Sequence, residues 1–109
     1  MSDLNQCTFT GRLGADPEHR STKAGDPIAN MRLAVGKQWK DRDGNKQEST
    51  EWISVVCFNK GLCKLMEYAQ KGTRLWVSGR FQARTWEDQS GQKRYSSEIV
   101  VQPFDGNIQ

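Results

Sequence analysis

Hydrophobic and polar residues alternate along most of this chain, and a period of two residues is the pattern that predicts β-strands. In residues 6–13, Cys7, Phe9 and Leu13 fall on one side of the backbone and Thr8 falls on the other. Similar alternation recurs in four later segments. The sequence therefore predicts five strands, over residues 6–13, 28–39, 48–58, 74–86 and 94–101.

One segment has helical spacing instead. Leu62, Leu65, Met66 and Ala69 recur at i, i+3, i+4 and i+7, and Gly72 follows where a C-terminal cap is expected. This spacing predicts a helix of about three turns between the third and fourth strands. The order of three strands, one helix and two strands predicts an all-β protein with the five-stranded barrel of the oligonucleotide-binding (OB) fold.

The segments between the predicted strands are rich in turn residues. Asp43-Gly44 is the strongest short hairpin signal, residues 87–93 make a second polar turn, and residues 20–27 are turn-rich as well. A chain of 109 residues has the size of one common domain. We therefore expect one OB-fold domain over residues 1–103, followed by residues 104–109, which are too few to form another element.

The third predicted strand carries bulky apolar residues on both faces, so one face is expected to join the core and the other to contact a partner. Trp52 and Phe58 project from the same face of this strand by the period of two. Trp39 and Trp86 lie instead at the bases of the two polar loops, where exposure is expected. These four aromatic residues are the candidate contact surface.

Lysine and arginine residues are interleaved with these aromatic residues. The net charge of +3, from 16 basic and 13 acidic residues, is modest but allows a polyanionic partner. Single-stranded nucleic acid is held by cations along its phosphates and by aromatic rings under its bases. The sequence therefore predicts such a site, with stacking on Trp39, Trp52, Phe58 and Trp86. Its predicted basic residues are Lys40, Arg42, Lys60, Lys71, Arg80, Arg84, Lys93 and Arg94.

Enzyme and metal signatures are absent from the sequence. Cys7, Cys57 and Cys63 lack metal-ligand spacing, so buried thiols are expected, with no metal and no cofactor. His19, the only histidine, has no nucleophile or acid at a recognisable spacing. Loop carboxylates could hold Mg²⁺ in a nuclease, but they lie in turn sequences where such side chains bind local backbone. They are Asp41, Asp43, Glu87 and Asp88.

The chain resembles the bacterial and phage single-stranded DNA-binding protein (SSB) family from about residue 5 to residue 101. The matching motifs are GRLGADPE at 11–18, TEW at 50–52, VVCFNK at 55–60, KG at 71–72, WEDQSGQ at 86–92 and RY at 94–95. Their order and spacing, rather than any single motif, make the resemblance specific.

This resemblance implies a homotetramer of OB folds that coats single-stranded DNA during replication, recombination and repair, without sequence preference. The family's stacking aromatics fall on the four residues named above, and its basic contacts fall near Arg42, Lys60, Lys71, Arg84 and Arg94. Trp76 is open to two interpretations from the residues alone, a base contact or a subunit contact, and the resemblance favours the second. The expected oligomer interface comprises Trp76, Ile53, Cys7 and Phe9.

The sequence also differs from the family pattern after the predicted barrel. Members typically continue into a flexible linker with an acidic tip that recruits other proteins, whereas this sequence reaches only Gln109. Recruitment through such a tip is therefore not expected. A tail-less OB module for RNA or for a replication-restart complex is the alternative function. The first residues do not resemble a secretion signal and no apolar run could span a membrane, so a cytoplasmic location is expected.

Overall fold

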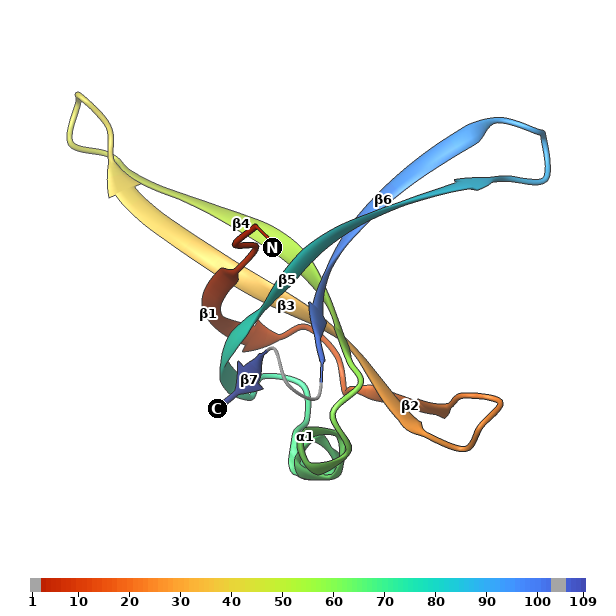
Figure 1. Cartoon of the computed structure of the whole chain (residues 1–109). Coiled ribbons are helices and arrows are strands. Elements are labelled where there is room, and N and C mark those ends of the chain that lie inside the picture. Colours follow the sequence, from red (N-terminus) through yellow and green to blue (C-terminus); the bar gives the residue numbers. More distant parts are fainter. Residues whose placement is uncertain (1–2, 103–105) are drawn as a thin grey trace.

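The computed structural model describes residues 3–102 and 106–109, most of which lie in strands (Figure 1). The five predicted strands are confirmed, and a helical segment lies between the third and fourth of them. No helix in the described ranges has the length and apolar character needed to cross a membrane. The confirmed strands are β1 (Cys7–Leu13), β3 (Pro27–Lys40), β4 (Lys46–Cys57), β5 (Arg74–Glu87) and β6 (Lys93–Val101).

These strands close into a barrel. They are hydrogen-bonded in the order β1-β3-β4-β6-β5, and β1 also pairs with β5, which joins the two ends of the sheet. β1 can make both contacts because it changes partner near Arg12: residues 7–12 pair with β5, and residues 12–13 pair with β3. The all-β prediction with a five-stranded OB barrel is therefore confirmed.

The core consists of every second side chain along these strands. Leu33, Val55, Val77 and Val101 are almost completely buried and belong to one continuous apolar cluster. Burying a side chain of this size contributes about 1.5–3 kcal/mol relative to leaving it exposed. This inward alternation fixes the register of each strand, because a shift by one residue would turn its apolar side chains toward solvent.

The helical segment differs from the prediction. It consists of helix α1 (Lys60–Leu65), which begins with the Asn59 side chain accepting a hydrogen bond from the Leu62 N–H, and the 3₁₀ helix η1 (Met66–Tyr68). Leu65 is 49% exposed, whereas Cys63 and Met66 are buried, so the buried side does not follow the predicted spacing. Its position is as predicted, because α1 lies at one end of the barrel (Figure 1).

Gly72 is not the C-terminal cap of this helical segment. η1 ends at Tyr68, and its C-cap Ala69 is already extended. Gly72 lies three residues after Ala69 in a turn closed by a hydrogen bond from Thr73 N–H to Gln70 O. Its φ of +90° is the conformation that favours glycine there.

Two short strands were missed by the sequence pattern. β2 (Glu18–Ser21) pairs with the beginning of β3 but is entirely exposed, so it has no apolar alternation to detect. β7 (Asn107–Ile108) pairs with β5, and Ile108 is only 2% exposed. The expectation that residues 104–109 form no element is therefore wrong for residues 106–109, because a two-residue ladder is too short to give a periodic signal. Residues 104 and 105 lie outside the described ranges.

Two long hairpins extend from the barrel as arms. The first joins β3 to β4 and the second joins β5 to β6, and both project away from the end that α1 covers (Figure 1). Beyond the barrel, each strand of an arm is paired only with its hairpin partner. The side chains there are exposed on both faces, which makes the arms the part of the fold most available to a partner.

Candidate nucleic-acid interface

The outer face of β4 carries two of the predicted aromatic residues. Cross-strand partners in a sheet share a face, so Trp52, opposite Ala34, lies on the side away from the buried Leu33 and Val55. Phe58 follows β4 directly, and its N–H donates to Val101 O at 2.8 Å, which continues the pairing of β4 with β6. Trp52 is 53% exposed and Phe58 is 37% exposed. The prediction that one face of this strand is core and the other is surface is confirmed.

The indole of Trp52 is held by two residues from other strands and loops. An ideal Cβ on Gly14 would lie 2.4 Å from Cζ3 of Trp52, so the ring packs directly against the Gly14 backbone. Arg32, from the neighbouring strand β3, lies over the same ring at 5.4 Å from its centroid. A cation at this distance is attracted to the ring face. Trp52 is therefore held in place while half of its surface stays open.

A shallow cleft borders the segment of the chain that joins Trp52 to Phe58. It has a volume of about 320 Å³, and the two outward residues that separate these aromatics, Ser54 and Val56, line it together with Arg32. The carboxylates of Glu18 and Glu98 also line it. Asp16 lines it too, so the cleft has three carboxylates and one cation, and none of its lining residues is aromatic.

The second arm presents Trp86 on the outer face of β5. This face is set by the buried Leu75 and Val77, which occupy the opposite side of the strand. Trp86 is 50% exposed and stands opposite Arg94 of β6. Arg80 and Arg84 share its face by the period of two. One tryptophan and three arginines therefore share one face of β5 and β6.

Trp39 lies on the other face of its arm from Trp52. It has the parity of Leu33 and Val35, but it lies beyond the barrel and is 43% exposed. Lys37 Nζ is 5.4 Å from the centroid of its ring. The first arm therefore offers an aromatic surface on both faces, each accompanied by a cation.

The predicted basic residues lie on the arms, at the start of α1 and in the loop between η1 and β5. Lys40 directly opposes Lys46 at the tip of the first arm, and like charges in this position destabilise a ladder unless an anion joins them. Lys60 begins α1 and lies 3.7 Å from Asp26 in an exposed ion pair. The N–H of Lys71 donates to Asp16 Oδ1 at 2.7 Å, which ties its loop to the loop after β1.

Three cations near the aromatic residues were missed by the sequence interpretation, which counted only cations close to an aromatic in sequence or supplied by the resemblance. Arg32 reaches Trp52 through strand pairing, and Lys46 opposes Lys40 through the hairpin. Lys37 precedes Trp39 by two residues and could have been found from the alternation alone. These residues are Arg32, Lys37 and Lys46.

Comparison with known proteins agrees with this arrangement. The sequence model of the single-strand binding protein family matches residues 4–108. The chain belongs to this family. A single-stranded DNA-binding protein of Rhizobium meliloti (strain 1021) is 48% identical over 107 residues, covering 96% of this chain and 62% of that relative. The chain thus spans less than two thirds of that relative's length.

A solved structure has the same fold. Plasmodium falciparum SSB in complex with ssDNA matches this family member with a TM-score of 0.89 and 27% sequence identity, covering 99% of this chain and 95% of that chain. The family resemblance that the motifs indicated is therefore confirmed, and the OB barrel is that of the family.

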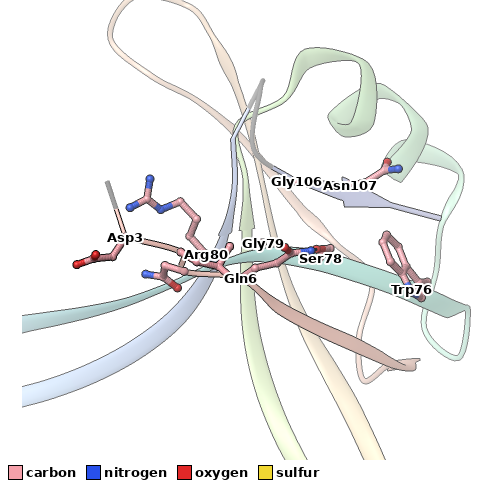
Figure 2. Close-up of a pocket in the computed structure, with 10 residues that line it drawn as sticks. Asp3, Gln6, Trp76, Ser78, Gly79, Arg80, Gly106 and Asn107 are labelled. Atoms are coloured by element: carbon pink, nitrogen blue, oxygen red, sulfur yellow. The ribbon is translucent and has the colours of Figure 1, made fainter. Parts of the chain in front are cut away.

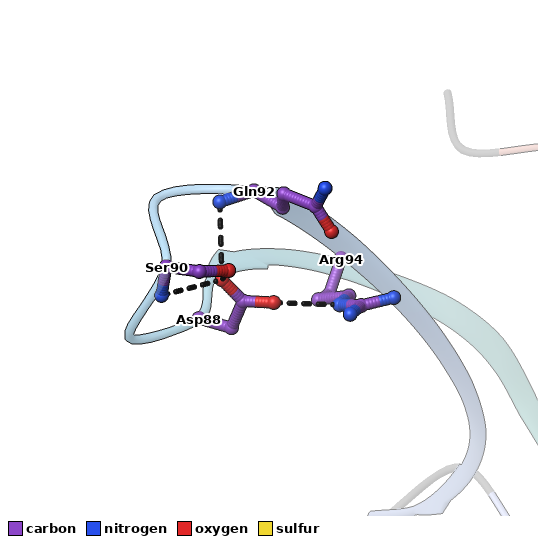
Figure 3. A network of polar contacts seen from close by, with 4 residues as sticks. All are labelled: Asp88, Ser90, Gln92 and Arg94. Carbon is purple, nitrogen blue, oxygen red and sulfur yellow. Dashed lines mark hydrogen bonds and ion pairs between the residues drawn. The ribbon is translucent and has the colours of Figure 1, made fainter.

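Two of the loop carboxylates of this family member, Asp41 and Asp88, accept hydrogen bonds within the turns at the hairpin tips. Asp41 Oδ1 accepts from the N–H groups of Asp43 and Asn45 at 2.9 Å each. Asp88 Oδ1 accepts from the Ser90 hydroxyl and N–H and from the Gln92 N–H (Figure 3). The prediction that turn sequences explain these two carboxylates is confirmed, and the described residues contain no group of three potential metal ligands.

Hydrogen bonds also shift the titration of both tip carboxylates. The Asn45 N–H lowers the pKa of Asp41 below its usual value, with smaller effects from Asp43 and Gln47. Hydrogen bonds from Ser90 and then from Arg94 lower the pKa of Asp88. Both carboxylates are therefore negatively charged at neutral pH, and each is hydrogen-bonded to the backbone of its own turn.

The residues expected at an oligomer interface divide between two sides of the sheet. Cys7, Phe9 and Ile53 are half-buried and pack against the apolar core cluster. Trp76 lies on the opposite side of β5, where its backbone exchanges hydrogen bonds of 2.7 and 2.8 Å with Gln109. Figure 2 shows it beside a cleft of about 590 Å³ that Ser78 and Arg80 also line.

Burial explains the state of the remaining thiols. Cys57 and Cys63 are buried free cysteines, as the sequence predicted, and the Cys63 thiol donates to Cys57 O at 3.3 Å. Burial raises the pKa of Cys57 to about 12, so this thiol stays protonated and unreactive at neutral pH.

Proposed function

We propose that this chain binds single-stranded DNA without sequence preference, by stacking bases on exposed aromatic rings and contacting phosphates with lysine and arginine. The observation that carries the proposal is the outer face of the sheet, where Trp52, Phe58 and Trp86 are exposed and Arg94 lies opposite Trp86. Trp39 adds an exposed ring on the opposite face of the first arm. The proposal is supported by the name of the R. meliloti relative and by the ssDNA complex of the P. falciparum structure.

The phosphate contacts in this proposal are Lys40, Arg42, Lys60, Lys71, Arg80, Arg84, Lys93 and Arg94, with Arg32, Lys37 and Lys46 added from the geometry. Coating of single strands in replication, recombination and repair is the cellular role that we propose. The role needs no catalysis, and we place it in the cytoplasm, where such strands arise in a bacterial cell.

Fluorescence titration tests the proposal. Because stacked bases quench indoles, oligo(dT) should strongly quench the tryptophan fluorescence of this protein, and added salt should weaken binding. A titration with neither quenching nor complex formation would refute the function.

Two alanine variants locate the stacking surface. Trp52→Ala and Trp86→Ala should each weaken oligo(dT) binding by about 1–3 kcal/mol, the usual contribution of one stacked base. Tyr68→Ala is the matched control, because Tyr68 is an 81% exposed aromatic on η1, at the end of the barrel away from the arms. Unchanged affinity in both tryptophan variants would mean that bases stack elsewhere.

Competition between DNA and RNA tests the alternative of an RNA or replication-restart module. A protein that selects RNA contacts the 2′-hydroxyl, and nothing in the sequence predicts such a contact. We therefore expect oligo(dT) to displace oligo(rU) at equal concentration. Equal or tighter RNA binding would favour the alternative.

We further propose a homotetramer in which Trp76 lies at a contact between subunits, as the family resemblance implies. A single OB domain holds only about 4–16 nucleotides, so several joined domains would let one strand pass over more than one stacking surface. Light scattering at micromolar concentration should give four times the monomer mass, and a monomer mass would refute this part of the proposal.

A further inference from the structure

The tips of the two arms are built from the same eight-residue pattern, Trp-x-Asp-x-x-Gly-x-Lys. It occurs at residues 39–46 and again at 86–93. In the first tip the N–H of Asp41 donates to Asn45 O at 3.0 Å, and in the second the N–H of Asp88 donates to Gln92 O at 3.0 Å. The glycine has nearly the same left-handed φ in both, +80° and +81°. The arms therefore provide a natural pair for comparison.

The two tips differ in the partner of one carboxylate oxygen. Asp41 Oδ2 accepts from the neutral Gln47 amide at 3.2 Å, whereas Asp88 Oδ2 binds Arg94 Nε at 2.8 Å (Figure 3). Gln47 and Arg94 are also the residues directly opposite Trp39 and Trp86. The side chain next to the tryptophan is thus neutral in the first arm and a carboxylate-bound cation in the second.

Asp88 does not need this second oxygen to form its turn. All three hydrogen bonds within the turn, from Ser90 N–H at 3.0 Å, Ser90 Oγ at 2.7 Å and Gln92 N–H at 3.0 Å, go to Oδ1. The contact with Arg94 is therefore additional to the turn. It places a negative charge against a guanidinium whose side chain remains 55% exposed beside Trp86.

We infer that Asp88 competes with DNA phosphate for Arg94 and so limits the affinity of the second arm for a single strand. This inference rests on the proposed function and concerns the same surface. A phosphate that follows a base stacked on Trp86 must compete with Asp88 for Arg94. In the first arm Asp41 contacts the neutral Gln47 at the corresponding position, so there is no cation there for which it could compete. Asp88 is thus a residue that sets affinity rather than one that contacts DNA.

The test compares Asp88→Asn with Asp41→Asn. Both variants remove one negative charge from an arm tip and keep an amide oxygen for the turn, but only the first releases an arginine. With oligo(dT) of fixed length, Asp88→Asn should bind about two- to fivefold tighter than Asp41→Asn, the range of an exposed ion pair. Its plot of log affinity against log salt should be steeper by about 0.7, which corresponds to one more phosphate contact on a single strand.

A double variant separates competition from a structural role. In the Arg94→Gln background, which copies the first arm, Asp88→Asn should change affinity and salt slope only as much as Asp41→Asn does in the wild type. Equal affinities and slopes for the two single variants, or weaker binding by Asp88→Asn, would overturn the inference. Failure of the wild type to bind oligo(dT) would instead refute the proposed function.

Discussion

Trp52 is held in its place by two residues that are distant in the sequence. Gly14 lies in the loop after β1 and leaves room for the indole, and Arg32 approaches the ring from β3. An exposed tryptophan would otherwise sample several rotamers and lose entropy when a base stacks on it. At the scale of single residues, the proposed interface therefore presents an aromatic ring that is already oriented.

We predict that Gly14→Ala weakens single-strand binding with little loss of stability. The added Cβ would lie 2.4 Å from the ring, and Trp52 is exposed enough to move away without opening the core. Oligo(dT) titration and urea unfolding measure the two effects. Gly36→Ala is the control, since no atom lies within 4 Å of its added Cβ. Unchanged affinity in Gly14→Ala would mean that Gly14 does not orient the indole.

At the scale of elements, the arms depend on their turns. Each arm continues beyond the barrel as a two-stranded ribbon, and an isolated ribbon of this kind is only marginally stable. The carboxylates of Asp41 and Asp88 bind the backbone N–H groups that the turns would otherwise leave without partners. The turns therefore keep the two strands of each arm aligned, and with them the tryptophans at their bases.

The charge of these carboxylates predicts a pH dependence of stability. Their pKa values in the folded protein lie below the usual 3.8, so they stabilise the fold above that pH and lose this contribution as the pH falls through the lower folded values. A variant carrying both Asp41→Asn and Asp88→Asn should therefore lose less stability than the wild type between about pH 7 and about pH 3. Urea unfolding at both pH values measures this difference, and an equal loss in the two proteins would contradict the prediction.

At the scale of the whole molecule, the barrel is closed by a pairing between the two ends of the sheet. β1 pairs with β5, and β7 adds to the other edge of β5 through Val77 and Ser78. The C-terminal residues 106–109 are thus part of the fold, and their apolar contribution is concentrated in Ile108.

We predict that Ile108→Ala lowers the free energy of unfolding by about 2–5 kcal/mol, the usual result of truncating a fully buried isoleucine. Its side chain is 2% exposed and belongs to the core cluster. Leu4→Ala serves as the control. It also shortens a four-carbon aliphatic side chain to a methyl group, but Leu4 is 90% exposed, so no cavity opens in the core. A difference of less than about 0.5 kcal/mol between the two variants would mean that β7 is not firmly packed.

The sequence by itself determined the strands, the barrel class and the exposed positions of Trp39, Trp52, Phe58 and Trp86, because alternation and turn residues are local signals. It could not determine where η1 begins, since Leu65 and Met66 both satisfy helical spacing and only packing decides which is buried. β2 and β7 were missed because β2 is exposed along its whole length and β7 has only two residues, so neither shows apolar periodicity.

Only the tertiary structure decided which residues meet across strands. Strand pairing places Arg32 over Trp52, opposes Lys40 with Lys46 and packs Gly14 against the indole. It also brings Arg94 opposite Trp86 within 2.8 Å of Asp88. Such contacts depend on the register and closure of the barrel, which are set by the whole core rather than by neighbours in the sequence.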